Sequence, residues 1–278
     1  MRVIRAAEMG MCFGVRDALA AADRLAAPGE VTIHGELVHN EEVLAGLDAR
    51  GFRMNGEGDR TRLPTTPQVL ITAHGVSERE RSRLQAAGKE LVDTTCPLVR
   101  YVHERARELA ASGYFVVVIG KPEHVEVAGL VGDLDEFAVV ERPGDAARWQ
   151  RPRLGVVAQT TTQPDRVDAI LEAIERANPD AEVRYVDTIC GPTRNRQQAL
   201  EQLLDKIDAL VVVGGRKSNN TRALVRRAER AGIPAVHVQG RDDLNPVDLR
   251  RYGVVGLTAG TSTLDRTIDD VHQALLEM

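Results

Sequence analysis

The stretch that decides the fold occurs twice. It reads Leu-Val-Asp-Thr-Thr-Cys-Pro at residues 91–97 and Tyr-Val-Asp-Thr-Ile-Cys-Gly-Pro at residues 185–192. In each copy a short apolar run leads to a cysteine, Cys96 or Cys190, and a helix-like pattern follows. The chain of 278 residues has one other cysteine, Cys12, which also follows a short apolar run and opens a helix-like stretch. The sequence therefore predicts three related segments, each with a cysteine between a strand and a helix.

The elements after each cysteine also repeat. Apolar residues at helical spacing give way to a short apolar run, then to a polar loop, and later to a second run and a second loop. His39, His124 and Ser218 lie in the first loops, 27, 28 and 28 residues after their cysteines. The second loops contain His74, Thr160 and Ser262. We take these six residues as corresponding positions of one repeated unit.

Such alternation predicts an α/β fold made of three pseudo-repeated α/β units with mostly parallel sheets. The predicted units are residues 1–94 with Cys12, 95–188 with Cys96 and 189–278 with Cys190, and the C-terminal helix packs near the first. Ligands of parallel sheets gather at the carboxyl ends of the strands. Because the cysteines and polar loops all fall at such ends, we expect the three units to face a common centre.

Composition excludes several classes of protein. The net charge is −5, the isoelectric point is near 5.9 and aromatic residues make up 3% of the chain, so a nucleic-acid partner is not expected. The longest apolar runs are too short to span a bilayer, so no membrane partner is expected either. We expect a cytoplasmic protein, where thiols stay reduced.

Three cysteines from distant parts of the chain suit a metal centre with one open position better than a disulfide framework. Zinc is one alternative, but structural zinc sites usually use C-x-x-C pairs and close to four ligands, and no such pair occurs. A [4Fe–4S] cluster suits widely separated cysteines, and its fourth iron could bind a substrate oxygen. Three buried, inert cysteines are the remaining interpretation, which their matched contexts disfavour.

Two of the polar loops suit an anion. The loop Ser218-Asn219-Asn220-Thr221 precedes a helical run, and hydroxyl, amide and backbone N–H groups at a helix start can bind phosphate. Ordinary N-capping is the commoner use of such residues and stays open for this loop alone. His39 and Asn40 precede the helical run of the first unit in the same way, which favours an anion. Neither loop is a P-loop, so nucleotide binding is disfavoured.

Glu126 is the candidate general acid. It lies two residues after His124 in an apolar stretch, and burial against an apolar wall would favour its protonated form. A solvated loop glutamate is the alternative. His74 by itself would more often be a capping or core histidine, His34 is ambiguous, and no role is assigned to the remaining histidines, which are His103, His237 and His272.

Together these motifs resemble 4-hydroxy-3-methylbut-2-enyl diphosphate reductase, an iron–sulfur enzyme family of the methylerythritol phosphate route to isoprenoids. The resemblance covers the whole chain in order. Its motifs are Met-Cys12-x-Gly-Val, Val-His39-Asn, Ala-His74-Gly-Val-Ser, Asp-Thr-Thr-Cys96-Pro-Leu-Val, His124-Val-Glu126-Val, Gln-Thr160-Thr, Asp-Thr-Ile-Cys190 with Arg196-Gln197, Ser218-x-Asn220 and Thr-Ala-Gly-x-Ser262.

The resemblance implies a trefoil of three α/β units around a [4Fe–4S] cluster held by Cys12, Cys96 and Cys190, whose open iron binds the substrate hydroxyl. It implies that Glu126, aided by Thr160, delivers protons. It also implies two electrons from ferredoxin or flavodoxin and the products isopentenyl and dimethylallyl diphosphate. The residues implied for the diphosphate are His39, His74, His124, Ser218, Asn219, Asn220 and Ser262.

The chain departs from the common family pattern at four positions, none of which is an implied ligand: Met11, Val125, Pro192 and Leu264. They bear on product ratio, electron donor and precise substrate, because residues around a cluster tune it. Two rival hypotheses remain. They are a non-catalytic iron–sulfur sensor and a zinc-dependent phosphohydrolase that uses the three cysteines.

Overall fold

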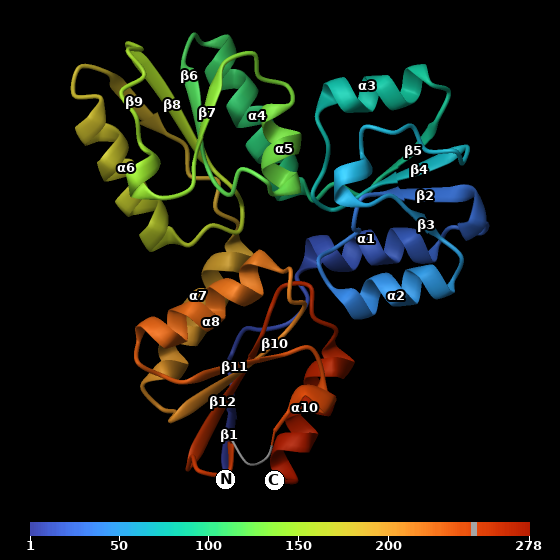
Figure 1. The fold of residues 1–278 in the computed structure, drawn as a ribbon, viewed down its shortest axis with the longest axis vertical. Coiled ribbons are helices and arrows are strands. Elements are labelled where there is room, and N and C mark those ends of the chain that lie inside the picture. The colour runs from blue at the N-terminus through green and yellow to red at the C-terminus, as the bar shows by residue number, and fades with distance from the viewer. Residues whose placement is uncertain (246–248) are drawn as a thin grey trace. The chain divides into compact units, whose positions relative to one another are not determined.

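A computed structural model describes residues 1–245 and 249–278. Within them the chain forms three four-stranded sheets in which every pairing is parallel, with helices between the strands (Figure 1). The predicted α/β fold of three repeated units is therefore confirmed. None of the helices in these two ranges is both long and apolar enough to cross a membrane.

The chain divides into two compact units. The first consists of Met1–Arg16, Val38–Gly46 and Gly191–Met278, and the second of Asp17–Leu37 and Leu47–Cys190. The first unit holds one sheet and the second holds two. Helices α1 (Phe13–Asp23) and α2 (Glu41–Ala49) each carry residues of both units.

The two sheets of the second unit have the same strand order. In each, the strand that comes first along the chain lies between the second and the third, and the fourth forms the edge next to the third. The first sheet has the order β3-β2-β4-β5 and the second has β7-β6-β8-β9. The strands are β2 (Val31–His34), β3 (Arg53–Met54), β4 (Gln68–Ile71), β5 (Glu90–Asp93), β6 (Phe115–Ile119), β7 (Phe137–Val140), β8 (Arg153–Ala158) and β9 (Glu182–Tyr185). The helices are α3 (Glu78–Ala86), α4 (Pro97–Ala111), α5 (Val125–Val131) and α6 (Pro164–Ala177), with short 3-10 turns at Pro28–Glu30, Glu57–Asp59 and Pro143–Asp145.

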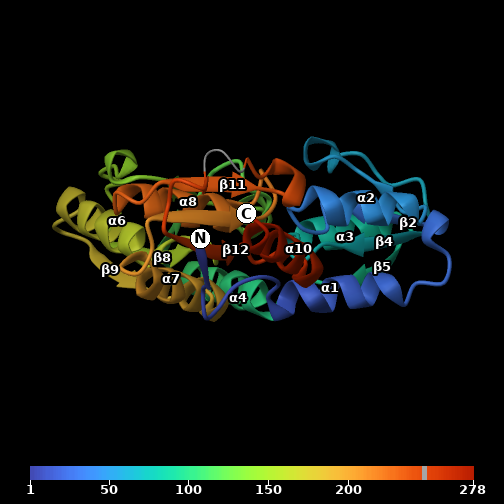
Figure 2. The same cartoon turned by 90° about the horizontal axis from the view of Figure 1, so that it is seen from below.

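The first unit has the same order, read as β11-β10-β12-β1. Its elements are β1 (Arg2–Arg5), α7 (Gly191–Leu204), β10 (Ala209–Val213), α8 (Asn219–Arg230), β11 (Ala235–Val238), β12 (Val254–Ala259) and α10 (Asp265–Leu276), with a 3-10 turn at Arg241–Asp243. Both termini lie in this unit, and Figure 2 shows it from the side on which they lie.

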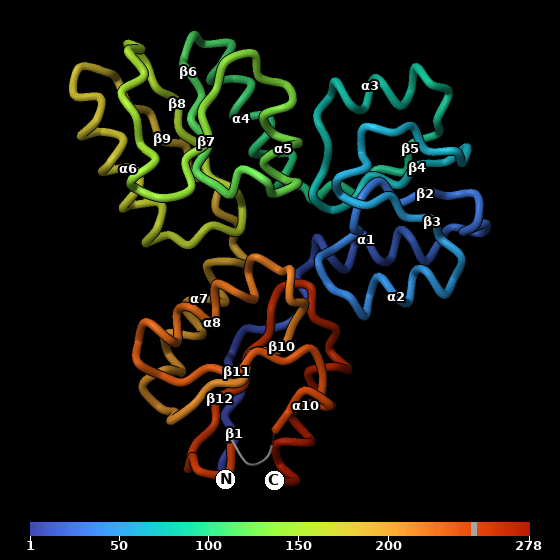
Figure 3. The backbone as a smooth tube through the Cα atoms, viewed as in Figure 1, coloured from blue at the N-terminus to red at the C-terminus, as the bar shows by residue number. Residues whose placement is uncertain are grey.

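Strand β1 takes the edge place that β5 and β9 take in the other sheets. It pairs with β12 in the register Arg2 to Val254 through Arg5 to Leu257, and the tube in Figure 3 shows the dark blue strand beside the red one. The predicted division at residues 94 and 188 placed this strand in the first unit along the chain. The hydrogen bonds instead place it in the sheet of the C-terminal segment, because parallel pairing does not require neighbours in sequence.

The cores follow from the alternation of strand side chains. In the first unit Leu210 and Val212 pack against α7 and α8 on one face, while Val211 and Val213 pack against α10 on the other. The side chains of β6 alternate in the same way: one face packs against α4 and α5, and the other packs against α6. Strands buried on both faces read as continuous apolar runs, which is why Phe115–Ile119 and Ala209–Val213 were recognisable in the sequence.

Candidate active site

All three cysteines lie in the same backbone environment and make the same main-chain hydrogen bond. Each follows the edge strand of a sheet, and its N–H donates to the carbonyl oxygen two residues beyond the end of the adjacent strand. The pairs are Cys12 with Thr261, Cys96 with Ala73 and Cys190 with Thr160, at N···O distances of 3.0, 3.1 and 3.0 Å. The repeat inferred from the sequence therefore extends to individual hydrogen bonds.

Each cysteine also stands at the start of a helix. Cys96 is the N-cap of α4, the carbonyl of Cys12 accepts from Arg16 in α1, and α7 begins directly after Cys190. All three are partly exposed and form no disulfide; they are the whole cysteine content of the chain. The positive end of a helix stabilises an anionic sulfur, so these positions suit thiolate ligands.

In the second unit the structure brings Glu126 and Thr160 together. Glu126 is 3% exposed in the first turn of α5, and Thr160 follows β8. The Thr160 N–H donates to Oε1 of Glu126 at 2.7 Å, and the Thr160 hydroxyl donates to Oε2 at 2.9 Å. The alternative of a solvated loop glutamate is therefore wrong.

His74 and His124 lie side by side in the same unit. Their rings meet edge to face with centroids 5.7 Å apart. His124 is the N-cap of α5, and its Nδ1 accepts from the N–H of Glu126 at 3.2 Å. A neutral imidazole that accepts at Nδ1 carries its proton at Nε2, so Nε2 is the donor atom of this ring.

In the first unit Ser218, Asn219 and Asn220 form the start of α8. Ser218 is the N-cap, and its hydroxyl accepts from the N–H of Thr221 at 3.3 Å, so the capping interpretation of this loop is correct. Asn219 is the first helical residue. Asn220 is 2% exposed, and neither polar atom of its side-chain amide has a hydrogen-bond partner among the described residues. Capping therefore does not account for Asn220.

His39 and Ser262 lie beside each other in the first unit. The Ser262 hydroxyl donates to the carbonyl of His39 at 3.2 Å, and the side chain of Asn40 donates to the carbonyl of Ser262 at 2.9 Å. Gly215 approaches the same place so closely that a Cβ on it would lie 2.4 Å from the His39 carbonyl oxygen. Only glycine fits there, and the loop before α8 consequently packs directly on the His39 loop.

Two predicted correspondences are wrong by one residue. Asn40, not His39, caps its helix, because its side chain accepts from Val43 at 3.1 Å and it lies 28 residues after Cys12, at the spacing of the other two caps. Likewise Thr161, not Thr160, corresponds to His74 and Ser262. Each of these three residues lies inside the same type of turn, closed by Gly75 to Thr72, Thr162 to Gln159 and Thr263 to Gly260.

Thr161 is accordingly a candidate that the sequence analysis missed. The side chain of Gln159 donates to its hydroxyl at 3.3 Å and accepts from the N–H of Lys121 at 3.1 Å. This ties the Thr161 turn to the loop after β6. Aligning the turns by the ends of their strands, rather than by distance from the cysteines, would have identified it.

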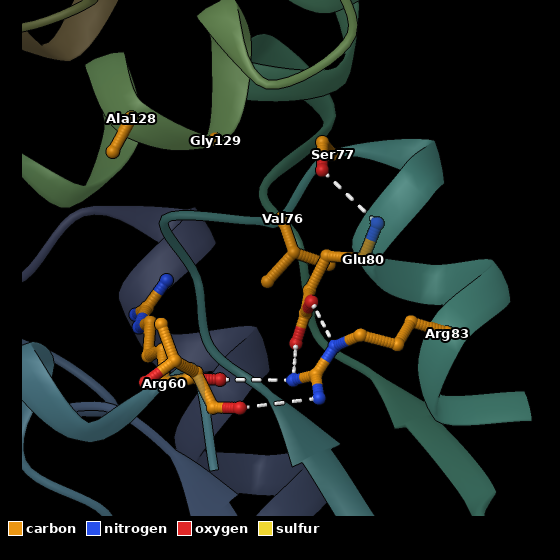
Figure 4. A pocket seen from close by; sticks show the side chains of 8 residues that line it. Arg60, Val76, Ser77, Glu80, Arg83, Ala128 and Gly129 are labelled. Atoms are coloured by element: carbon orange, nitrogen blue, oxygen red, sulfur yellow. Dashed lines mark hydrogen bonds and ion pairs between the residues drawn. The ribbon is translucent and has the colours of Figure 1, made fainter. Parts of the chain in front are cut away.

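A cavity of about 350 Å³ in the second unit has a different lining. It lies between α3, α5 and the loop that carries Arg60, and Figure 4 shows Glu80 and Arg83, both on α3, joined to each other where they line it. Arg83 donates to both carboxylate oxygens of Glu80 at 2.7 Å and to the carbonyl of Arg60 at 3.0 Å. None of the predicted site residues within the described ranges lines this cavity.

Two histidines of the second unit are structural. His34 is fully buried with its Nε2 2.9 Å from Glu80, and burial together with the charge of Arg60 lowers its pKa against the opposing effect of Glu80. His103 is 8% exposed in α4, and burial lowers its pKa to about 4. Both are neutral at pH 7 and therefore add no charge to the core.

Comparison with known proteins identifies the family. The model of the LytB protein family matches residues 3–276. A protein of Oleidesulfovibrio alaskensis named 4-hydroxy-3-methylbut-2-enyl diphosphate reductase is 37% identical over 284 residues, which cover 99% of both chains. A protein of Thermoanaerobacter sp. with the same name is 32% identical over 277 residues, which cover 98% of this chain and 95% of the relative.

Solved structures agree. The E-1-hydroxy-2-methyl-but-2-enyl-4-diphosphate reductase of Plasmodium falciparum has a TM-score of 0.91 at 28% identity, covering 99% of this chain and 87% of the other. A structure described as (E)-4-hydroxy-3-methyl-but-2-enyl diphosphate reductase, the terminal enzyme of the non-mevalonate pathway, has a TM-score of 0.70 at 31% identity, with both chains fully covered. The chain belongs to the LytB protein family and is an enzyme of the reductase class.

Proposed function

We propose that the chain converts (E)-4-hydroxy-3-methylbut-2-enyl diphosphate to isopentenyl diphosphate and dimethylallyl diphosphate. The overall reaction consumes two electrons and two protons, breaks the C–O bond of the hydroxyl group and releases water. The names of the relatives support this substrate, and the buried pair of Glu126 with Thr160 supports the proton chemistry.

Cys12, Cys96 and Cys190 would hold a [4Fe–4S] cluster. The fit rests on their shared backbone environment, their places at helix starts and the absence of disulfides among them. Three protein thiolates leave one iron open, and the bound cluster supplies a binding site for the substrate hydroxyl and a path for single electrons. Ferredoxin or flavodoxin is the proposed donor, and a cytoplasmic location remains a prediction from cysteine usage.

Glu126 would hold one of the two protons that the reaction consumes. The Thr160 hydroxyl donates to Oε2 in the structure; when Oε2 is protonated, the hydroxyl can rotate to accept that proton while it passes its own proton onward. The Thr160 N–H holds Oε1 in place, so the orientation of the carboxyl group is set before substrate arrives. Exposure of only 3% excludes bulk water from this proton.

The diphosphate would bind to the polar residues that the sequence analysis assigns to it, and to Thr161. In the first unit the amide of Asn220, which has no hydrogen-bond partner among the described residues, and the hydroxyl of Ser218 lie at the start of a twelve-residue helix, where anions are favoured. The remaining proposed contacts are His39, His74, His124, Asn219, Thr161 and Ser262. A buried amide without partners costs free energy, and an anion that accepts from its nitrogen offsets part of that cost.

The buried Glu126–Thr160 pair carries the proposal. The test is an anaerobic assay with the hydroxymethylbutenyl diphosphate and a chemical reductant, followed by identification of the products. We expect both isopentenyl and dimethylallyl diphosphate, and a coloured protein. A colourless protein that releases phosphate without reductant would favour the zinc phosphohydrolase, and a coloured protein without diphosphate affinity would favour the sensor.

A further inference from the structure

Arg196 is a buried arginine that lies in α7, six residues after Cys190. It is 5% exposed, and its guanidinium donates to carbonyl groups of two separate segments. Its Nε and Nη2 reach the carbonyl oxygen of Gly10 at 3.1 and 2.5 Å, and its Nη1 reaches that of Pro192 at 3.0 Å. The side chain therefore joins the segment before Cys12 to the first turn of the helix after Cys190.

Gly10 is fixed from its other side as well. Its φ of +77° is left-handed, and a Cβ on it would lie 2.7 Å from Cδ1 of Ile268 in α10. Its N–H donates to the carbonyl of Ala259 at 3.3 Å, and two residues later Cys12 donates to Thr261. The loop to Cys12 is thus held through its N–H groups by the end of β12 and the turn that follows it, and through the carbonyl of Gly10 by Arg196.

Arginine suits this task better than other residues. A buried guanidinium costs free energy unless it is hydrogen-bonded, and here its donors meet main-chain carbonyls in two directions at once. The ammonium group of lysine could reach one of the two carbonyls but lacks the rigid fork that bridges them. The hydrogen bonds offset the free-energy cost of burying the charge, and they fix the position of the loop before Cys12.

We propose that Arg196 is a positioning residue for the iron–sulfur site, where it holds the Cys12 loop against α7 and so sets the place of one ligand relative to the segment of another. The inference rests on the proposed [4Fe–4S] cluster. Residues that orient metal ligands change both metal retention and redox potential when they are replaced.

The test compares the reconstituted wild-type protein with R196M, R196K and R16M. Arg16 is the matched control, because it also donates to the Cys12 loop, at the carbonyl of Met11, but its side chain is 55% exposed. The measurements are iron per chain, the rate of cluster loss to a chelator, the midpoint potential and spectrum of the cluster, and thermal unfolding of the cluster-free protein.

We expect R196M to lose its cluster about tenfold faster or more, as the loss of hydrogen bonds from a charged group implies. Its midpoint potential and spectrum should shift as well, R196K should lie between R196M and wild type, and R16M should match wild type. R196M with wild-type retention and potential overturns the inference, as does a change confined to thermal unfolding.

If R196M does not fold, R196K decides, and a lysine variant identical to wild type overturns the inference. A wild-type protein that takes up no cluster at all rejects the proposed function instead.

Discussion

Replacing Glu126 by glutamine removes the acidic proton without changing the shape of the site. The two side chains have the same size, and the amide oxygen can take the place of Oε1 opposite the fixed N–H of Thr160. The amide nitrogen then faces the Thr160 hydroxyl, which can rotate from donor to acceptor. Both hydrogen bonds persist, so we expect the free energy of unfolding to change by less than about 1 kcal/mol.

The effect on turnover should be much larger. General acid catalysis contributes about 10²- to 10⁴-fold, which corresponds to about 3–5 kcal/mol of activation free energy. We therefore expect kcat of E126Q to fall at least a hundredfold while KM changes little, because Glu126 carries no part of the diphosphate contact. Anaerobic steady-state kinetics with a chemical reductant measure both constants.

E123Q is the matched control. Glu123 belongs to the same loop, but its side chain is 84% exposed beside Lys121, so its replacement should leave kcat unchanged. An E126Q variant that keeps kcat within about threefold of wild type would remove this carboxyl group from the mechanism. A similar loss in E123Q would show that the loop, not the proton, is responsible.

Three further predictions follow from individual residues. C96S should lose the cluster while the fold persists, which iron analysis and circular dichroism would test; retention of a full complement of iron would argue against Cys96 as a ligand. N220A should raise KM for the diphosphate about tenfold or more with little change in kcat, since hydrogen bonds to a charged group are lost, whereas N195A at an exposed site should not. The third concerns acid. Because burial lowers the folded pKa of His103 to about 4 from 6.5, its contribution to stability is complete above pH 6.5 and is lost as the pH falls toward 4, by about 2 kcal/mol at pH 5. Urea unfolding of the wild type and H103Q at pH 7.5 and 5 measures this, and an equal loss in both proteins would contradict it.

The order of elements was predictable because the central strands are buried on both faces. Val116–Ile119 and Leu210–Val213 read as uninterrupted apolar runs, and each cysteine precedes a clear helical pattern. Edge strands lack that signal. β3 has only two residues and could not be recognised. The repeat predicts a strand before Cys12, but β1 carries arginines at both ends, and nothing in the local sequence indicates that it pairs with β12.

The site could be predicted by residue type but not by register. Counting from the cysteines assigned His39 to the position that Asn40 occupies and Thr160 to the position that Thr161 occupies. Each count is wrong by one residue because the loops differ in length. The contact of Glu126 with Thr160 joins residues that are 34 positions apart. Arg196 belongs to the motif that follows Cys190, but its contacts could not be inferred, since its partners are main-chain carbonyls, which any residue provides.

During translation the edge strand Arg2–Arg5 leaves the ribosome well before its partner β12, because the paired residues Arg2 and Val254 lie 252 positions apart. At about 5–20 residues per second, on the order of ten to fifty seconds separate the two events. Throughout that interval the nascent segment before Cys12 has no sheet to join, although the 174-residue stretch from Asp17 to Cys190 already contains two complete sheets. Iron delivery should therefore follow the synthesis of β12, and a truncation that removes β12 should disable Cys12, which lies more than two hundred residues before it.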